Sequence, residues 1–142
     1  MIRPIWSVLC QSASFDAQTN SVSLLNILEN IMVLGEPDDE HPVAIPAEMV
    51  SLWSRENITS PATGSMRLYY IDPNGTQSTP ISLGIDLSKA IYHRTRINLT
   101  GLLLTKKGLY SFIVEYQISG VEAWQMAANI PLLVLTQQLA QP

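Results

Sequence analysis

Two histidines and one cysteine are the side chains of this sequence best suited to act as a base or a nucleophile. A nucleophilic mechanism needs a serine or cysteine next to a histidine, and usually a carboxylate that orients the histidine. His93 precedes Arg94, and a neighbouring cation disfavours the imidazolium ion that a general base must become. Cys10 lies in an alternating apolar run, where a free thiol behaves as a small buried hydrophobe. We therefore expect structural roles for both side chains, no catalytic residue and no cofactor.

A short acidic loop offers a second kind of chemistry. Asp38, Asp39 and Glu40 precede His41 between two prolines. Clustered carboxylates suit a calcium or magnesium ion, but ligand loops space their carboxylates so that several converge on one point. Adjacent side chains diverge instead, so we expect a solvated loop and no metal site. The alternative is a small-ligand site or a hydrolase that uses residues 38–41 with a histidine, because loops on a rigid scaffold often carry sites.

Two arginines offer a third kind of chemistry, the binding of an anion. Arg94 and Arg96 project from the same side of one predicted strand, with Lys89 nearby. Paired guanidinium groups can bind a carboxylate or a phosphate, so these residues are candidates for an anion or partner contact. The alternative is a solvated strand surface, where such charges discourage pairing between sheet edges. The sequence contains no glycine-rich phosphate loop and no pair of closely spaced cysteines or histidines.

Charge and composition argue against several classes of partner. The chain carries 8 basic and 12 acidic residues, and the basic residues are scattered, so no face is suited to nucleic acid. The longest apolar stretches, 24–34 and 127–135, are interrupted and fall short of the ~20 residues that span a bilayer. The apolar run after Met1 is too short for a signal peptide, and one cysteine cannot form an internal disulfide. We expect a cytoplasmic protein that binds neither nucleic acid nor membrane.

Alternating apolar residues predict strands through most of the chain. The period of two is clearest in residues 81–87, 110–118 and 124–134, with turn residues between such runs and no convincing helix. A length of 142 residues fits one domain. We therefore expect a single all-β domain over 1–142, with a frayed tail at 136–142. Its expected fold is a two-sheet antiparallel β-sandwich of immunoglobulin-like architecture with about eight strands.

The segment from Ser23 to Leu34 is ambiguous. Its apolar residues recur at helical spacing and also fill both faces of a strand. It follows a turn rich in Asp and Asn over residues 15–20, which predicts a hairpin with the strand that starts at Ile5. No acidic residue stands three positions after Ser23 to form a capping box. We therefore favour a strand buried on both faces, and a helix is the alternative.

Several phrases of the sequence occur together in a familiar order. They are Asp16-x-x-Thr19-Asn20 before Ser23-Leu24 and Asn26-Ile27, Pro42-x-x-Ile45-Pro46 before Val50-x-Leu52-Trp53, and Gly108-x-Tyr110-x-Phe112. In this order the chain resembles a family of small uncharacterised bacterial proteins. The resemblance implies a β-sandwich and a strand over Ser23–Leu34, and it carries no catalytic residue across. Gly108-x-Tyr110 is also similar to the tyrosine corner of immunoglobulin-like sandwiches, with Phe112 where antibody domains have a cysteine.

The apolar content of the chain motivates the functional hypothesis. Hydrophobic residues make up 46% of the sequence and charged residues only 14%, although a sandwich strand offers only alternate residues to the core. Apolar residues fill both faces of 23–34, and Met49 and Trp53 lie opposite Val50 and Leu52. We therefore expect an uncovered apolar surface, with Trp53 and Met49 as candidate interface residues. The function predicted is a non-enzymatic protein-binding or assembly module, which forms a homodimer or binds an unidentified protein.

Overall fold

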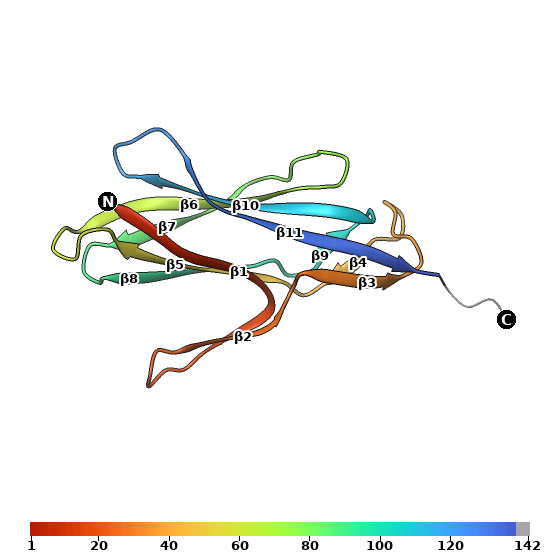
Figure 1. Cartoon of the computed structure of the whole chain (residues 1–142), viewed down its shortest axis with the longest axis horizontal. Coiled ribbons are helices and arrows are strands. Elements are labelled where there is room, and N and C mark those ends of the chain that lie inside the picture. Colours follow the sequence, from red (N-terminus) through yellow and green to blue (C-terminus); the bar gives the residue numbers. More distant parts are fainter. Residues whose placement is uncertain (139–142) are drawn as a thin grey trace.

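Strands form two large sheets and one small ribbon in residues 1–138, the part that this computed structural model describes (Figure 1). Sheet A contains, in spatial order, β2 (Val22–Ile27), β1 (Ile2–Phe15), β5 (Glu48–Arg55) and β8 (Tyr92–Asn98). Sheet B contains β3 (Asn30–Leu34), β11 (Gln125–Gln137), β10 (Gly108–Ile118), β6 (Ala62–Ile71) and β7 (Ile81–Leu87). The ribbon pairs β4 (Val43–Ile45) with β9 (Leu102–Leu104). The described chain is thus all-β.

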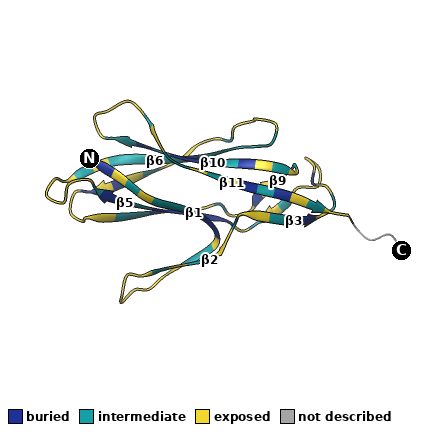
Figure 2. Ribbon diagram, viewed as in Figure 1, coloured by how far each residue is buried: buried dark blue, intermediate teal, exposed yellow. Residues whose placement is uncertain are grey.

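The hydrophobic core fills the space between sheets A and B (Figure 2). Trp53 of β5 is completely buried there, and its ring centroid lies 5.6 Å from that of Tyr116 on β10. The indole N–H of Trp53 donates to Oγ1 of Thr95, 2.9 Å away, which satisfies both polar groups inside the core. Leu102 and Leu104 of the ribbon are buried in the same cluster. The ribbon therefore contributes side chains to the core although it belongs to neither large sheet.

The strand count differs from the expectation. The described residues form 11 strands in three sheets instead of about eight strands in two, because the ribbon and β3 were not anticipated as separate elements. The pairing of β3 with β11 is also parallel, whereas the other pairings are antiparallel. The clean period of two in residues 81–87 located its strand correctly, since β7 spans Ile81–Leu87. Thr136 and Gln137 belong to β11, and the rest of the predicted frayed tail beyond residue 138 lies outside the described residues.

The ambiguous segment from Ser23 to Leu34 is extended, so the strand interpretation is confirmed and the helix is wrong. It is not one strand buried on both faces, however. It divides into β2 in sheet A and β3 in sheet B, and the two strands are joined by a crossing segment at Leu28 and Glu29. The Leu28 N–H donates to the Leu9 carbonyl in sheet A, and the Glu29 carbonyl accepts from the Leu133 N–H in sheet B, at 2.9 and 3.0 Å. The crossing segment therefore links the two sheets through backbone hydrogen bonds.

The far part of the β1–β2 hairpin bends out of sheet A and lies on the outer side of β5 and β8, the side that points away from the core (Figure 1). Its turn contains Asn20 with a φ of 57°, the left-handed conformation that asparagine tolerates. The Ala13 N–H donates to Oε2 of Glu48 on β5 at 2.8 Å, and the Arg94 side chain on β8 bonds to Asn20. Val50 is 0% exposed although it points to the outer face. The hairpin thus covers part of a face that a sandwich usually leaves to solvent.

The Tyr110 side chain forms hydrogen bonds with the backbone at the corner before β10. The Tyr110 hydroxyl donates to the Lys106 carbonyl at 3.0 Å, and the Lys106 N–H lies 3.2 Å from the same hydroxyl oxygen. A tyrosine hydroxyl that bonds to the backbone a few residues upstream is one feature of the tyrosine corner. The Nζ of Lys106 also pairs with Oδ2 of Asp72 at 3.0 Å, which ties this corner to the turn after β6.

Candidate functional site

Met49 and Trp53 are core residues, so the prediction that they form an interface is wrong. Their exposed fractions are 1% and 0%. Both point between the sheets, and the opposite face of β5 carries Val50 and Leu52. The sequence shows that β5 is apolar on both faces, but it does not show that the β1–β2 hairpin folds back over the outer one. Neither residue is accessible to a partner in this structure.

The acidic loop lies apart from the second histidine. His41 donates its backbone N–H to Oδ1 of Asp38 at 2.6 Å, and its ring Nδ1 lies 3.2 Å from the same oxygen. That N–H bond is the main cause of the lowered pKa of Asp38, and both side chains are largely exposed. The loop after β3 and the start of β8, which carries His93, lie at opposite ends of the molecule (Figure 1). The structure therefore does not combine residues 38–41 with His93.

His93 and Cys10 are engaged in the fold. The Asp86 N–H donates to Nδ1 of His93 at 2.6 Å, so this nitrogen serves as an acceptor and joins β8 to β7 at the edges of the two sheets. Cys10 is completely buried, and burial, followed by the charge of Glu48, raises the pKa of its thiol. A buried thiol with a raised pKa is a poor nucleophile.

Glu48 and Arg96 form an ion pair on the outer face of sheet A. Nη2 of Arg96 donates to Oε1 of Glu48 at 2.7 Å, and Nε donates to Oε2 at 3.2 Å. The Glu48 side chain is only 8% exposed beneath the hairpin, whereas that of Arg96 is 44% exposed. The hydrogen bond to Glu48 is the main cause of the raised pKa of Arg96. Because this guanidinium already binds a carboxylate in two places, its charge is matched within the chain.

Arg94 lies two residues away on the same face but binds no carboxylate in the described part of the chain. Its guanidinium donates to Oδ1 of Asn20 at 3.3 Å and to the backbone carbonyl of the same residue. Its central carbon lies 5.7 Å from the ring centroid of Phe15. A pocket of about 450 Å³, which we call the Arg94 pocket, is lined by Asn20, Leu52, Tyr92, His93 and Arg94. The two arginines that the sequence singled out therefore differ: one is paired and the other lines a pocket.

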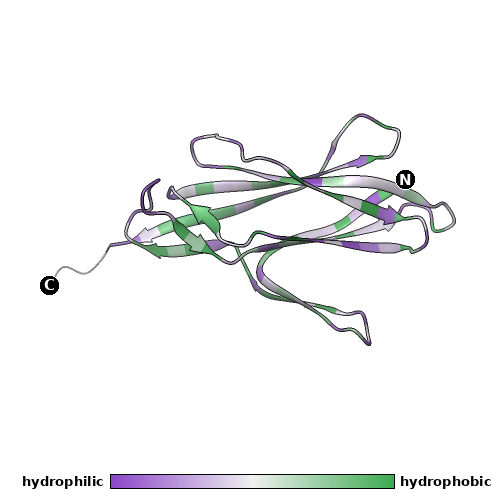
Figure 3. Ribbon diagram, turned by 180° about the vertical axis from the view of Figure 1, so that it is seen from behind, coloured by the Kyte–Doolittle hydropathy of each residue, from purple (hydrophilic) through white to green (hydrophobic). Residues whose placement is uncertain are grey.

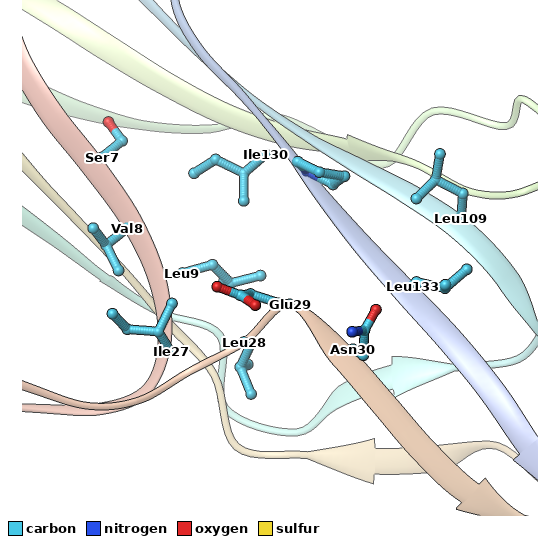
Figure 4. A pocket seen from close by; sticks show the side chains of 11 residues that line it. Ser7, Val8, Leu9, Ile27, Leu28, Glu29, Asn30, Leu109, Ile130 and Leu133 are labelled. Carbon is cyan, nitrogen blue, oxygen red and sulfur yellow. The ribbon is translucent and has the colours of Figure 1, made fainter.

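A larger apolar pocket lies where the two sheets meet at the crossing segment (Figure 4). It encloses about 610 Å³, and Ser7, Val8 and Leu9 of β1 line one side while Ile130 and Leu133 of β11 line the other. The remaining lining residues are Ile27, Leu28, Glu29, Asn30, Leu109 and Pro131. Glu29 is the one charged residue among them. We call this the edge pocket.

Exposed apolar side chains continue from the edge pocket onto the outer face of sheet B. Leu109 of β10 pairs with Leu133 of β11, and Leu135 of β11 pairs with Met32 of β3, so these four side chains lie on one face in adjacent strands. Leu34 follows two positions after Met32 and is 68% exposed, and Met32 itself is 58% exposed. We call these five residues the apolar end surface. Green, hydrophobic segments of the ribbon are visible at this end of the molecule, as they are on other strands (Figure 3).

Sequence reasoning anticipated part of this surface and missed the rest. The apolar residues on both faces of 23–34 predicted an uncovered set, and Met32 and Leu34 belong to it. Leu109, Leu133 and Leu135 belong to strands whose alternation looks ordinary, so only the register between strands brings them beside β3. The edge pocket depends on the crossing segment between the sheets, and the ambiguity of 23–34 is the one sequence feature that points to this segment.

Other classes of site receive no support from the described residues. Within residues 1–138, no group of three or more His, Cys, Asp or Glu side chains is arranged to hold a metal ion. The same residues contain no helix with the length and apolar content needed to cross a membrane.

Comparison with models of known protein families and with curated proteins gave no match. A solved structure to which the chain is similar is a family 123 glycoside hydrolase from Clostridium perfringens, from a study of glycolipid glycan hydrolysis. The similarity has a TM-score of 0.39 and 15% sequence identity, and it covers 83% of this chain. The chain spans 24% of that enzyme, about a quarter of its length. So weak a similarity carries no argument about fold family or function.

Proposed function

We propose that this protein is a non-enzymatic binding and assembly module that forms a two-fold dimer through the apolar end surface. One observation carries the proposal: five apolar side chains from β3, β10 and β11 lie together on one exposed face, beside an apolar pocket of about 610 Å³. Contiguous apolar surface of this kind on a soluble protein usually marks a contact surface. His93 and Cys10 support a non-enzymatic role, because their hydrogen bonding and burial serve the fold.

The absence of charge on this surface favours a second copy as the partner. A two-fold interface brings each patch against itself, so any unpaired charge at its centre would face its own copy. None of the five residues of the apolar end surface is charged. At its rim, Nζ of Lys107 lies 2.5 Å from Oε1 of Glu36, so these two charges are paired within one chain. A strongly basic or acidic partner would find no complementary charge on the five side chains.

The outer edge of β3 supports the same partner. Solvent-exposed edge strands are commonly protected by lysine, proline or inward-pointing charge. β3 has the sequence Asn-Ile-Met-Val-Leu and carries none of these, whereas the edge strand β8 carries Arg94 and Arg96. Pairing with another copy would satisfy the free backbone groups of β3 and bring the exposed Met32 side chains of the two copies close together.

Light scattering coupled to size exclusion at micromolar concentration tests the proposal. We expect a mass twice that of the 15.7 kDa chain. Met32→Lys places a charge where the side chain is 58% exposed, so the monomer should still fold. It should weaken the dimer by about a hundredfold or more, because juxtaposed like charges cost several kcal/mol.

The matched control is Ile58→Lys, which adds the same charge at a residue that is 65% exposed in the loop after β5. This loop lies at the opposite end of the molecule from β3 (Figure 1). The control should remain a dimer. A monomer mass that persists when the wild-type protein is concentrated would refute self-association. A dimer that withstands Met32→Lys would refute the location of the contact.

We also propose that the chain is a divergent immunoglobulin-like sandwich of the bacterial cytoplasm, related to the small bacterial family that its sequence resembles. The tyrosine corner at Tyr110 and the packing of sheet A on sheet B support the architectural part. The buried free thiol of Cys10 supports a reducing compartment. An experimental structure that superimposes poorly on immunoglobulin-like domains would contradict the first part, and recovery of the native protein outside the cytoplasm would contradict the second.

A further inference from the structure

The Arg94 pocket lies outside the apolar end surface and has a different chemistry. It is formed by β5 and β8 of sheet A and the tip of the β1–β2 hairpin, and its lining combines a guanidinium, an amide, an imidazole, a leucine and a tyrosine. We propose that this pocket binds a small carboxylate whose apolar or aromatic body lies against Leu52 and Tyr92.

The guanidinium of Arg94 is held in place before any ligand arrives. Two of its N–H groups donate to the side chain and backbone of Asn20, and the ring of Phe15 lies beside it at 5.7 Å. A guanidinium has five N–H donors. Within residues 1–138, no further acceptor bonds to those of Arg94. The unused donors therefore remain for a ligand, and the hairpin reduces the entropy lost when they bind it.

The charge balance selects a monoanion. The charge of Arg96, two residues away, is matched by Glu48 at 2.7 Å, and Arg94 has no carboxylate within 4.0 Å in the described chain. The pocket lining thus offers one unmatched positive charge on a planar fork, which fits the two oxygens of a carboxylate. A phosphate dianion would bring a second negative charge that no other cationic side chain of the lining matches.

The side chains of Leu52 and Tyr92 favour an apolar group attached to that carboxylate. Tyr92 is 62% exposed, although it is a large side chain beside a pocket. Leu52 pairs with Arg94 across β5 and β8, so its side chain lies on the same face next to the guanidinium. A flat ring placed on these two side chains would be covered on one side while its carboxylate reached Arg94.

Titration of the ¹⁵N-labelled protein with benzoate, followed by amide chemical shifts, tests the proposal. Benzoate should shift the amides of Asn20, Tyr92 and Arg94, and should bind more tightly than acetate, inorganic phosphate or benzyl alcohol. Equal effects of phosphate and benzoate would reduce the site to nonspecific anion binding and overturn the proposal. Shifts confined to other parts of the protein, or no shifts at millimolar benzoate, would also overturn it.

Variants separate the contribution of the Arg94 charge to benzoate binding from that of the apolar contacts. Arg94→Gln should weaken benzoate binding by about tenfold or more, because a hydrogen bond between charged groups is lost. Arg3→Gln removes the same charge from an exposed position on β1 and should change nothing. Equal losses in both variants would refute a specific site.

Arg94→Gln also removes the bonds to Asn20, so it could weaken benzoate binding merely by releasing the hairpin. Tyr92→Ala is a second test because it leaves these bonds intact. It should weaken benzoate by about threefold or more and leave acetate unchanged, because only benzoate has a ring to lose contact. Benzoate binding that Tyr92→Ala leaves intact would refute the orientation proposed. Met32 lies in sheet B and Arg94 in sheet A, so Met32→Lys tests the dimer without touching this pocket. Failure of the dimer and failure of the ligand site can therefore be told apart.

Discussion

Gly64 and Gly84 occupy neighbouring strands, yet a methyl group should have opposite effects at the two positions. Gly64 of β6 pairs with Ile118 of β10 and with Ile85 of β7. A Cβ atom there would lie 2.3 Å from the carbonyl oxygen of Gln117. Gly84 of β7 has nothing within 4 Å of the corresponding position, and neither glycine has a positive φ. The two substitutions therefore differ in packing and not in backbone strain.

The size of the Gly64→Ala effect follows from what must move. The Cβ would also lie 2.6 Å from Cδ1 of Ile2, but that atom is the end of a flexible side chain. The Gln117 carbonyl is part of the backbone of β10, where Gln117 pairs with Ser65 of β6, so it cannot retreat without moving the strand. Overpacking of this kind costs about 1–3 kcal/mol. Gly84→Ala should instead stabilise by about 0.5–1 kcal/mol, because glycine in a strand interior is entropically costly.

Urea unfolding followed by tryptophan fluorescence measures the stability of both variants. Protein concentration is held fixed because the proposed dimerisation would shift the apparent stability. With an m-value of about 2 kcal/mol/M, a loss of about 2 kcal/mol lowers the midpoint by roughly 1 M. We expect the urea midpoint of Gly64→Ala to fall by about that amount, and the midpoint of Gly84→Ala to rise or stay constant. Equal midpoints for the two variants would show that β6 and β10 are not as close as the structure has them.

Three further predictions concern single contacts. Tyr110→Phe removes the bonds to Lys106 and should cost about 1 kcal/mol of unfolding free energy in the same urea assay, so an unchanged midpoint would deny the corner a role in stability. His93→Ala removes the acceptor for the Asp86 N–H and should cost a similar amount, about 1 kcal/mol, with faster amide exchange at that N–H as the specific readout. The pKa of Asp72 lies below its ordinary value of 3.8, because its carboxylate accepts hydrogen bonds first from the Thr76 N–H and then from Lys106. Ionised Asp72 therefore stabilises the fold above pH 3.8, and this contribution is lost as the pH falls through the lower pKa of the folded state. Asp72→Asn should flatten the pH dependence of the unfolding free energy below 3.8, and an unchanged slope in acid titration would contradict the assignment.

Local pattern was sufficient for the strands that lie within one sheet. Residues 81–87 alternate cleanly because one face of β7 meets the core, and the structure begins and ends that strand at the same residues. The corner at Tyr110 and the turn at Asn20 also follow from local chemistry, since one needs a hydroxyl near a backbone carbonyl and the other a residue that tolerates positive φ.

Tertiary context decided the elements that the sequence left open or assigned wrongly. Residues 23–34 satisfy both periods because they serve two sheets in turn, and a single periodicity cannot describe a chain that changes sheets at Leu28. The same limit applies to Met49 and Trp53. Two apolar faces on β5 require two covers, but the sequence does not say which face meets the other sheet and which meets the hairpin.

The hairpin also changes what the high apolar content implies about assembly. Cys10 and Val50 are fully buried on the outer face of sheet A, so part of the apolar surplus is covered within one chain and gives no reason to expect a partner there. Met32 and Leu34 have no such cover in the described residues, because β3 has β11 on one side and a free edge on the other. Uncovered apolar side chains therefore remain at this end of sheet B, whereas in sheet A the most exposed aliphatic side chains, Leu25 and Ile27, lie on the hairpin strand β2. The hairpin fixes Arg94 on the outer face of sheet A without matching its charge, and this position lies away from the proposed dimer surface on sheet B. The proposed ligand site would therefore stay accessible in the monomer and in the proposed dimer alike.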